Sequence, residues 1–418
     1  MTRFHHSLTA SALLVSLAIP HATAADTAHR RANPVLHWNT IAGAVFAPTQ
    51  GLDPLGQSRT FAILHAAIHD VVNAIDARYV PYTPGLPLTP AASLDAGVAA
   101  AARAVIVALV PDQAALVEEA YAGALAAIDE GPAKAAGIAA GHAAATATLR
   151  RRYHDGLTGV TQPLYVPKAA PGDYQFSAPF DVAILPGWGR LQPFVIETDE
   201  HRLGGPLPLS GPQYARDFAE VKAIGGLTSP TRSHDQSQIA QFWYEDSPLG
   251  WNRIANTVMA GNELDPWRAA RTLALLNFAM ADAYIAGFAD KYEHRFWRPV
   301  TAIQQAATDG NPRTQADPAW TPFLLTPPVP DYPSTHTVVG TAAAEVLIDA
   351  FGDAIRFDAT SLTLPGATRS FIGFSMAARE NGMSRVYAGI HFPHAVKDGH
   401  RQGRGVGRAV TGALPPLR

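Results

Sequence analysis

Apolar residues recur at helical spacing along most of the chain. In the segment 58–77 they fall three or four positions apart, which places them on one face of an amphipathic helix. The segment 91–153 is rich in alanine and is interrupted at Pro111 and at Gly131-Pro132. Such breaks end helices, so this segment predicts two or three closely packed helices.

The second half of the chain predicts further helices. Candidate segments are, in order, 235–244, 251–261, 266–292, 334–351, 368–382 and 393–413. No run alternates apolar and polar side chains for long enough to predict a major sheet, and no internal repeat is evident. The predicted fold class is therefore all-α, a helical bundle.

Proline and glycine crowd one internal segment, from about residue 161 to 214. Prolines at this density remove backbone donors and break helices, so we expect an ordered excursion or a connector here. It is the only candidate for a domain boundary. We expect residues 25–418 to form a single helical domain, with its core at about 266–413.

The first 24 residues have the pattern of a secretory signal peptide. A charged start precedes an apolar stretch at 8–19, and small residues occupy 22–24. We therefore expect a secreted or periplasmic protein whose mature form begins near Ala25. The apolar stretch is short for a bilayer, and no later segment offers the roughly 20 uncharged apolar residues of a membrane helix, so no membrane span is expected.

Composition limits where the chemistry can lie. The 32 basic and 35 acidic residues give a formal charge of -3, which argues against nucleic acid or an anionic membrane as a partner. The absence of cysteine excludes disulfides, thiolate metal sites and a cysteine nucleophile. Any basic site must therefore be local.

Two patterns in the last third of the chain could bind an anion. Lys291 and Arg298 stand seven residues apart, and Pro299 follows. Seven residues make about two helical turns, so both cations could lie on one side of a helix. Two cations on a solvent-exposed helix face have the same spacing. Ser334 and His336 precede an apolar run, and serine there is typical of a helix N-cap. The free N–H groups of a helix start can bind an anion, while an ordinary cap is the plainer interpretation.

A third pattern follows, in which Arg385 and His391 stand six residues apart across a glycine. Each alone could be an ion-paired arginine or a core histidine. In this order the three patterns resemble the superfamily that joins vanadium-dependent haloperoxidases to type-2 phosphatidic acid phosphatases and bacterial acid phosphatases. The segments 186–194 and 296–303 also resemble its secreted bacterial haloperoxidase-like branch.

The resemblance implies a helical bundle with a site for vanadate or phosphate. Lys291, Arg298 and Arg385 would neutralise the equatorial oxygens, and Ser334 and the backbone N–H of Thr335 would donate hydrogen bonds. His391 would be the axial group, bonding the vanadium of vanadate or attacking phosphorus. His336, opposite, would be the acid–base. Residues 329–332 are candidate neighbours of the pocket above the oxyanion.

Two positions depart from the family pattern. Thr335 stands where glycine is usual and adds a side chain beside the oxyanion. Ala395 stands where an aspartate, four residues after the axial histidine, usually orients the imidazole. His394, Asp398 or a backbone carbonyl are the candidate substitutes. Because nucleophilic phosphatase chemistry depends on that orientation, its loss favours the peroxidase.

The expected activity is oxidation of halide by hydrogen peroxide with vanadate as cofactor. A phosphomonoesterase on the same scaffold, acting on a phosphate ester, and a non-catalytic oxyanion-binding protein are the alternatives. Phosphate should compete with vanadate, because both oxyanions need the same donors. A homodimer is left open.

Two smaller features have competing interpretations. His65 and His69 have the i, i+4 spacing of zinc-binding helices, but two core or interhelical histidines explain the pattern as well. Asp282 could pair with a cation of the site or make a plain hydrogen bond between helices.

Overall fold

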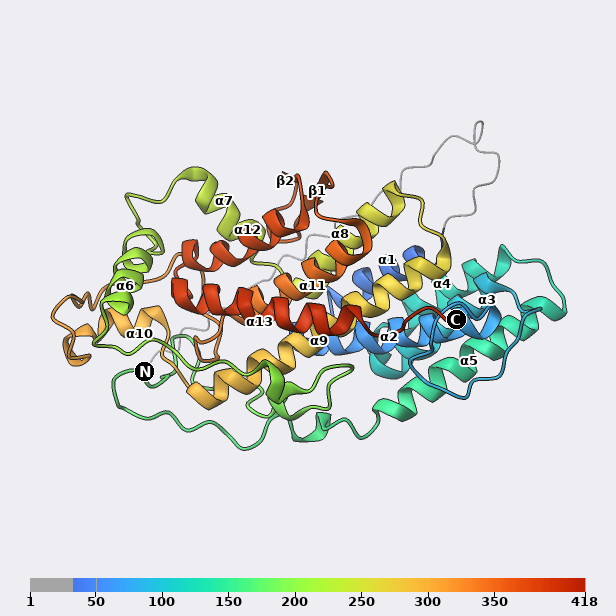
Figure 1. The fold of residues 1–418 in the computed structure, drawn as a ribbon, viewed down its shortest axis with the longest axis horizontal. Coiled ribbons are helices and arrows are strands. Elements are labelled where there is room, and N and C mark those ends of the chain that lie inside the picture. Colours follow the sequence, from blue (N-terminus) through green and yellow to red (C-terminus); the bar gives the residue numbers. More distant parts are fainter. Residues whose placement is uncertain (1–32, 50, 418) are drawn as a thin grey trace, which may run out of the picture. The chain divides into compact units, whose positions relative to one another are not determined.

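Helices form most of the described chain (Figure 1). The computed structural model describes residues 33–49 and 51–417, and the predicted signal peptide lies outside them. In chain order the α-helices of this part are α1 (Pro34–Phe46), α2 (Pro54–Ile75), α3 (Leu94–Leu109), α4 (Ala114–Ala126), α5 (Pro132–Arg152), α6 (Pro212–Ile224), α7 (His234–Phe242), α8 (Ser247–Gly261), α9 (Pro266–His294), α10 (Pro299–Gln304), α11 (Thr335–Phe351), α12 (Phe374–Tyr387) and α13 (Pro393–Thr411). The all-α prediction is confirmed.

One predicted helix is wrong over its first residues. The segment predicted at 368–382 begins with β2 (Thr368–Phe371), which pairs antiparallel with β1 (Phe357–Thr360), and α12 starts only at Phe374. The rings of Phe357 and Phe371 pack 5.5 Å apart, so burial of this aromatic pair favours a hairpin over helical spacing. The helices α1, α6 and α10 were not predicted.

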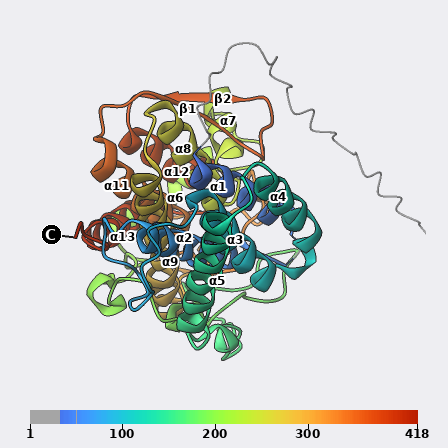
Figure 2. The same ribbon diagram turned by 90° about the vertical axis from the view of Figure 1, so that its right-hand side faces the viewer.

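The long helix α9 is the centre of the packing that positions the site. It packs against α2, α11 and α13. Asp265 caps its start by accepting from the backbone N–H groups of Trp267 and Arg268. In length and composition α9 could cross a membrane, but 94% of its most apolar window is buried within the protein. It is therefore a core helix, and Figure 2 shows it with α11 and α13 to its left and α3 and α4 to its right.

Small residues bring α13 close to α11. A Cβ atom at Gly399 would lie 2.9 Å from the Ser334 carbonyl oxygen, and one at Gly403 would clash with the Val338 carbonyl oxygen. Only glycine permits this approach, which brings the starts of both helices together.

The Pro/Gly-rich segment is an ordered excursion that packs on α9. The Asp282 carboxylate accepts hydrogen bonds from the backbone N–H groups of Phe194, Val195 and Ile196, at 2.7, 2.9 and 3.1 Å. Both interpretations offered for Asp282 are therefore wrong, because it pairs with neither a cation of the site nor another helix. Asp290, two turns later, accepts from the Leu203 N–H in the same way, at 3.1 Å.

The two histidines of α2 lie in the core. His65 Nε2 is 2.9 Å from Asn39 Oδ1, and His69 Nε2 is 3.1 Å from the Val80 carbonyl oxygen. Burial lowers the pKa of His65 to about 3 and that of His69 to about 4. Both rings are therefore neutral at ordinary pH and bonded to protein groups.

Candidate oxyanion site

The predicted site residues converge where α9 ends and α11 begins. Lys291 lies in the last turn of α9, Ser334 is the N-cap of α11, and Arg385 lies in the last turn of α12. A cavity of about 260 Å³ is lined by Lys291, Arg298, Thr335, His336, Arg385 and His391. Ser334 is fully buried at the N-cap directly before Thr335.

Lys291 and Arg298 do not share a helical face, so that part of the spacing argument is wrong. α9 ends at His294, and Arg295 follows in the left-handed region with φ 48°. Arg298 is the N-cap of the next helix, α10, which Pro299 begins rather than ends. The two cations meet because the chain turns between them.

Lys291 donates its hydrogen bonds to groups of the protein itself. Its Nζ donates to the carbonyl oxygens of Pro330, Asp331 and Pro333, at 2.6, 3.0 and 2.7 Å. An ammonium group has three donors, so all three are used. Burial, and then the charge of Arg298, hold its pKa well below the usual value. Lys291 therefore fixes the segment 330–333 beside the cavity.

Arg298 sets the protonation of His391. Its Nε donates to the Val329 carbonyl oxygen at 2.7 Å, and its Nη1 donates to the Ile390 carbonyl oxygen at 2.6 Å and to His391 Nε2 at 3.0 Å. A guanidinium only donates, so Nε2 is the accepting nitrogen and the neutral ring carries its proton on Nδ1. Burial and the surrounding cations hold the pKa of His391 well below its usual value.

His336 is a second neutral histidine in the cavity wall. Its Nδ1 lies 3.0 Å from Ser247 Oγ, and its Nε2 lies 2.9 Å from the side-chain nitrogen of Asn381. Burial, and then the charge of Arg385, hold its pKa well below the usual value. Nothing in the sequence singled out Ser247 or Asn381, because each comes from a helix distant in the chain.

Arg385 completes the basic side of the cavity. Its Nη2 donates to the Trp243 carbonyl oxygen at 2.7 Å, and its Nε donates to Ser384 Oγ at 3.1 Å. Burial lowers its pKa to about 10, so the side chain stays charged at neutral pH. Arg298 and Arg385 thus bring two buried positive charges to one small cavity.

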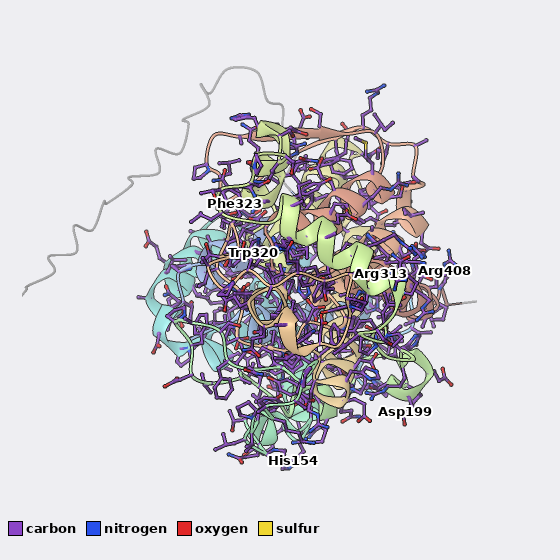
Figure 3. All side chains as sticks on the ribbon, turned by 90° about the vertical axis from the view of Figure 1, so that its left-hand side faces the viewer. His154, Asp199, Arg313, Trp320, Phe323 and Arg408 are labelled. Carbon is purple, nitrogen blue, oxygen red and sulfur yellow. The ribbon has the colours of Figure 1, made fainter. Side chains whose placement is uncertain are left out.

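A larger surface hollow, of about 800 Å³, lies beside α6, where Arg313 and Trp320 are labelled in Figure 3. None of the predicted site residues lines it. Lys222 there donates to the Gln315 carbonyl oxygen at 2.8 Å, and the Trp320 indole donates to the Lys222 carbonyl oxygen at 3.0 Å. These polar groups are hydrogen-bonded to one another and not directed at a ligand. The smaller buried cavity is therefore the better candidate site.

Comparison with known proteins finds similar sequences and folds. Residues 271–415 match the family model for the VCPO second helical-bundle domain. The vanadium chloroperoxidase of Curvularia inaequalis is 27% identical over 205 residues, which cover 40% of this chain and 33% of that protein. The match thus spans about a third of the relative's length. Over its last third the chain is therefore similar to the second helical-bundle domain of vanadium chloroperoxidases.

Solved structures extend the likeness to most of the chain. A bacterial vanadium-dependent iodoperoxidase superposes with a TM-score of 0.79 at 26% identity, covering 92% of this chain and 97% of the other. A bacterial vanadium-dependent chloroperoxidase in its holo form has a TM-score of 0.71 at 18% identity, covering 89% and 94%. The second likeness concerns the fold alone.

Thr335, where the vanadium haloperoxidase superfamily usually has glycine, is accommodated by the facing helix. Its side chain lies against Gly287 of α9, and its Oγ1 is buried without a hydrogen-bond partner. Ser334 occupies the N-cap, but its Oγ makes no capping bond and accepts from Thr337 Oγ1 at 2.9 Å. The predicted helix start is correct, while the predicted side-chain cap is absent.

None of the predicted substitutes for the family's aspartate contacts the imidazole of His391. His394 Nδ1 lies 3.0 Å from Asp217 Oδ2, and Asp398 accepts from the Tyr332 hydroxyl at 2.6 Å. The Ala395 carbonyl oxygen accepts from the Ser334 N–H at 3.0 Å. His394 and Asp398 are therefore wrong, because each has another partner, and a backbone carbonyl is wrong because His391 Nδ1 makes no hydrogen bond of ordinary geometry.

The carboxylate beside His391 belongs to Asp331, which sequence reasoning missed. Asp331 Oδ1 lies 2.9 Å from His391 Nδ1. Burial raises the pKa of Asp331 to about 6, and the charge of Arg298 opposes this rise. The available signal was an acidic residue within 329–332, the segment expected beside the pocket.

Proposed function

We propose that the protein is a vanadium-dependent haloperoxidase, which oxidises halide with hydrogen peroxide when vanadate is bound. The observation that carries the proposal is the neutral His391, whose unprotonated Nε2 lies in a small cavity beside two buried guanidinium groups. Relatives named as vanadium chloroperoxidase and iodoperoxidase support the same function.

The donor set fits vanadate. Arg298 and Arg385 would supply positive charge for the oxygens of the anion, and the first N–H groups of α11 would add the positive end of a helix dipole. The Lys291 charge acts over a short distance while its N–H groups hold the segment 330–333. The unpartnered Thr335 Oγ1, in a residue that lines the cavity, is a further donor for an oxyanion.

Each histidine has a nitrogen suited to its role. His391 Nε2 would be the nitrogen that holds vanadium, and it would be free to do so if Arg298 Nη1, which lies 3.0 Å from it, bonded the anion instead. His336 is kept neutral by burial, so its Nε2 can accept a proton from hydrogen peroxide once Asn381 gives way. Bound vanadate would supply Lewis-acid activation of the peroxide.

A phosphatase remains the second candidate because of Asp331. Nucleophilic attack on phosphorus needs an oriented and basic imidazole, and position 395, where the family usually has an aspartate that gives this support, is an alanine. A carboxylate 2.9 Å from His391 Nδ1 answers this objection. The peroxidase stays first, because relatives that bear that name match both the sequence and the fold.

The two activities separate in one experiment. Purified protein is assayed for peroxide-dependent bromide and iodide oxidation with added orthovanadate, and for hydrolysis of an aryl phosphate without it, with His391→Ala as the control. Vanadate-dependent halide oxidation that phosphate suppresses supports the haloperoxidase. Hydrolysis that vanadate inhibits, without halide oxidation, supports the phosphatase instead.

Calorimetric binding of phosphate and vanadate covers the remaining outcomes. Two anions that compete for one site without any turnover would indicate an oxyanion-binding protein. If neither anion bound, the proposed site itself would be refuted.

A further inference from the structure

His391 needs a partner for the ring nitrogen that faces away from the anion. Arg298 donates to Nε2, so the proton of the neutral ring is on Nδ1. A buried N–H without a partner is unfavourable, and a ring held at one nitrogen only can rotate or change tautomer. The position that usually supplies the carboxylate is Ala395, a buried methyl group packed among apolar side chains.

We propose that Asp331 is the positioning residue of His391 and takes over the role of the aspartate that the family carries on the helix after the axial histidine. The proposal rests on the proposed oxyanion function for the meaning of His391. The same histidine is then supported from the loop before α11 instead of from α13.

The first support is that the two groups lie side by side in the protein interior. Asp331 Oδ1 lies 2.9 Å from His391 Nδ1. Nδ1 and both carboxylate oxygens are buried, and Nδ1 makes no hydrogen bond of ordinary geometry to any other group. The backbone N–H of Phe392, the residue after His391, also lowers the pKa of Asp331. A small rotation of either side chain directs the Nδ1 proton at the carboxylate, so pairing is favourable for both groups.

The second support is that the backbone of Asp331 is held firmly. Its N–H donates to the Phe296 carbonyl oxygen at 2.8 Å. Its own carbonyl oxygen and those of Pro330 and Pro333 accept from Lys291. By holding this backbone, Lys291 also places the Asp331 carboxylate beside His391.

The expected consequence is a fixed tautomer. A carboxylate at Nδ1 keeps the proton there, leaves the Nε2 lone pair directed at the cavity and makes that nitrogen a better ligand. Lys291 and Arg298 lie close enough to balance the carboxylate charge, as their mutual effects on the pKa values indicate.

Two anions distinguish this role from a simple effect of charge. Phosphate would be held by charge and hydrogen bonds, whereas vanadate also bonds to Nε2. Removing a nearby negative charge should leave phosphate affinity unchanged or increase it, but loss of positioning should lower vanadate affinity. We expect Asp331→Ala to weaken vanadate at least tenfold and phosphate not at all, measured by calorimetry.

Matched variants sharpen the test. Asp398→Ala removes a carboxylate on α13 that bonds Tyr332 and does not touch His391, and it should leave both affinities within twofold. In the His391→Ala background, Asp331→Ala should have no further effect on vanadate. Should Asp331→Ala fail to fold, Asp331→Asn keeps the volume and removes the charge, and it takes the same measurements.

Nitrogen-15 NMR of the histidine rings gives a readout independent of turnover. The His391 signals, assigned by their loss in His391→Ala, should show protonated Nδ1 in the wild type and a mixture of tautomers in Asp331→Ala. Parallel weakening of both anions, an additive loss in the His391→Ala background, or an unchanged tautomer would overturn the proposal. Absence of halide oxidation with the expected tautomer change would refute the haloperoxidase and leave Asp331 in its role.

Discussion

Gly287 of α9 faces Thr335 at the start of α11, and a Cβ atom at Gly287 would lie 3.0 Å from Thr335 Cγ2. The Thr335 side chain, at a position where the family usually has glycine, fits beside the start of α11 because the facing residue of α9 has no side chain.

This close contact predicts that Gly287→Val is destabilising. Its added carbons would meet Thr335 directly, and overpacking of this kind costs about 1 to 3 kcal/mol of unfolding free energy. Phosphate affinity should fall as well, because the first turn of α11 is displaced. Adding Thr335→Gly should recover most of both losses. Urea unfolding and calorimetry measure them, and a double variant no better than Gly287→Val would contradict the steric explanation.

Lys291→Met should mainly reduce stability. It leaves three buried carbonyl oxygens, those of Pro330, Asp331 and Pro333, without their donor. Each such loss costs about 1 to 3 kcal/mol, so the unfolding free energy should fall by about 3 kcal/mol or more. Chemical denaturation tests this. A variant as stable as the wild type would show that Lys291 does not hold this segment.

Arg385→Ala should mainly reduce anion binding. Charge-assisted hydrogen bonds contribute about 1.5 to 3 kcal/mol each, so phosphate and vanadate should both bind roughly ten- to a hundredfold more weakly. Titration of vanadate at fixed phosphate, in wild type and variant, measures the loss and the competition together. Independent binding of the two anions would show that they do not share this cavity.

His391→Ala should abolish vanadate-dependent turnover and keep the helical fold. The axial ligand is lost, while two buried guanidinium groups and the start of α11 can still hold an anion. Circular dichroism and halide oxidation are measured on the same sample. Full activity in the folded variant would remove His391 from its proposed role.

The buried carboxylate of Asp282 predicts a pH dependence of stability. Burial raises its pKa to about 6, although three backbone N–H groups oppose the rise. The folded state therefore binds this proton more tightly than the unfolded chain, whose aspartate pKa is about 3.9. The stabilising contribution is complete below about pH 4 and is lost as the pH rises through about 6, an effect of about 3 kcal/mol.

The test compares wild type with Asp282→Asn by urea unfolding between pH 4 and 7. The stability of the wild type relative to the variant should fall as the pH rises, because only the wild type ionises at this position. A difference that stays constant across this range would contradict the raised pKa.

Features that depend on neighbours in the chain were predictable from the sequence. Apolar spacing predicted most of the long helices, because apolar residues at helical spacing lie on one face of the helix, and that face is buried. The position of Ser334 before an apolar run predicted the start of α11. Three short motifs, through their resemblance to a known superfamily, named six of the residues that line the cavity, because residue types and their order are local properties.

Partners across the fold were decided by tertiary structure. Asp331 and His391 are sixty positions apart, and no local rule relates them until Lys291 and the close packing of α11 and α13 bring their segments together. For the same reason Asp282, although recognised as a notable residue, was given the wrong partners. The sequence by itself identified candidate side chains for the chemistry. The tertiary structure decided which groups orient them, because a buried polar atom pairs with whatever the packing places within hydrogen-bond distance.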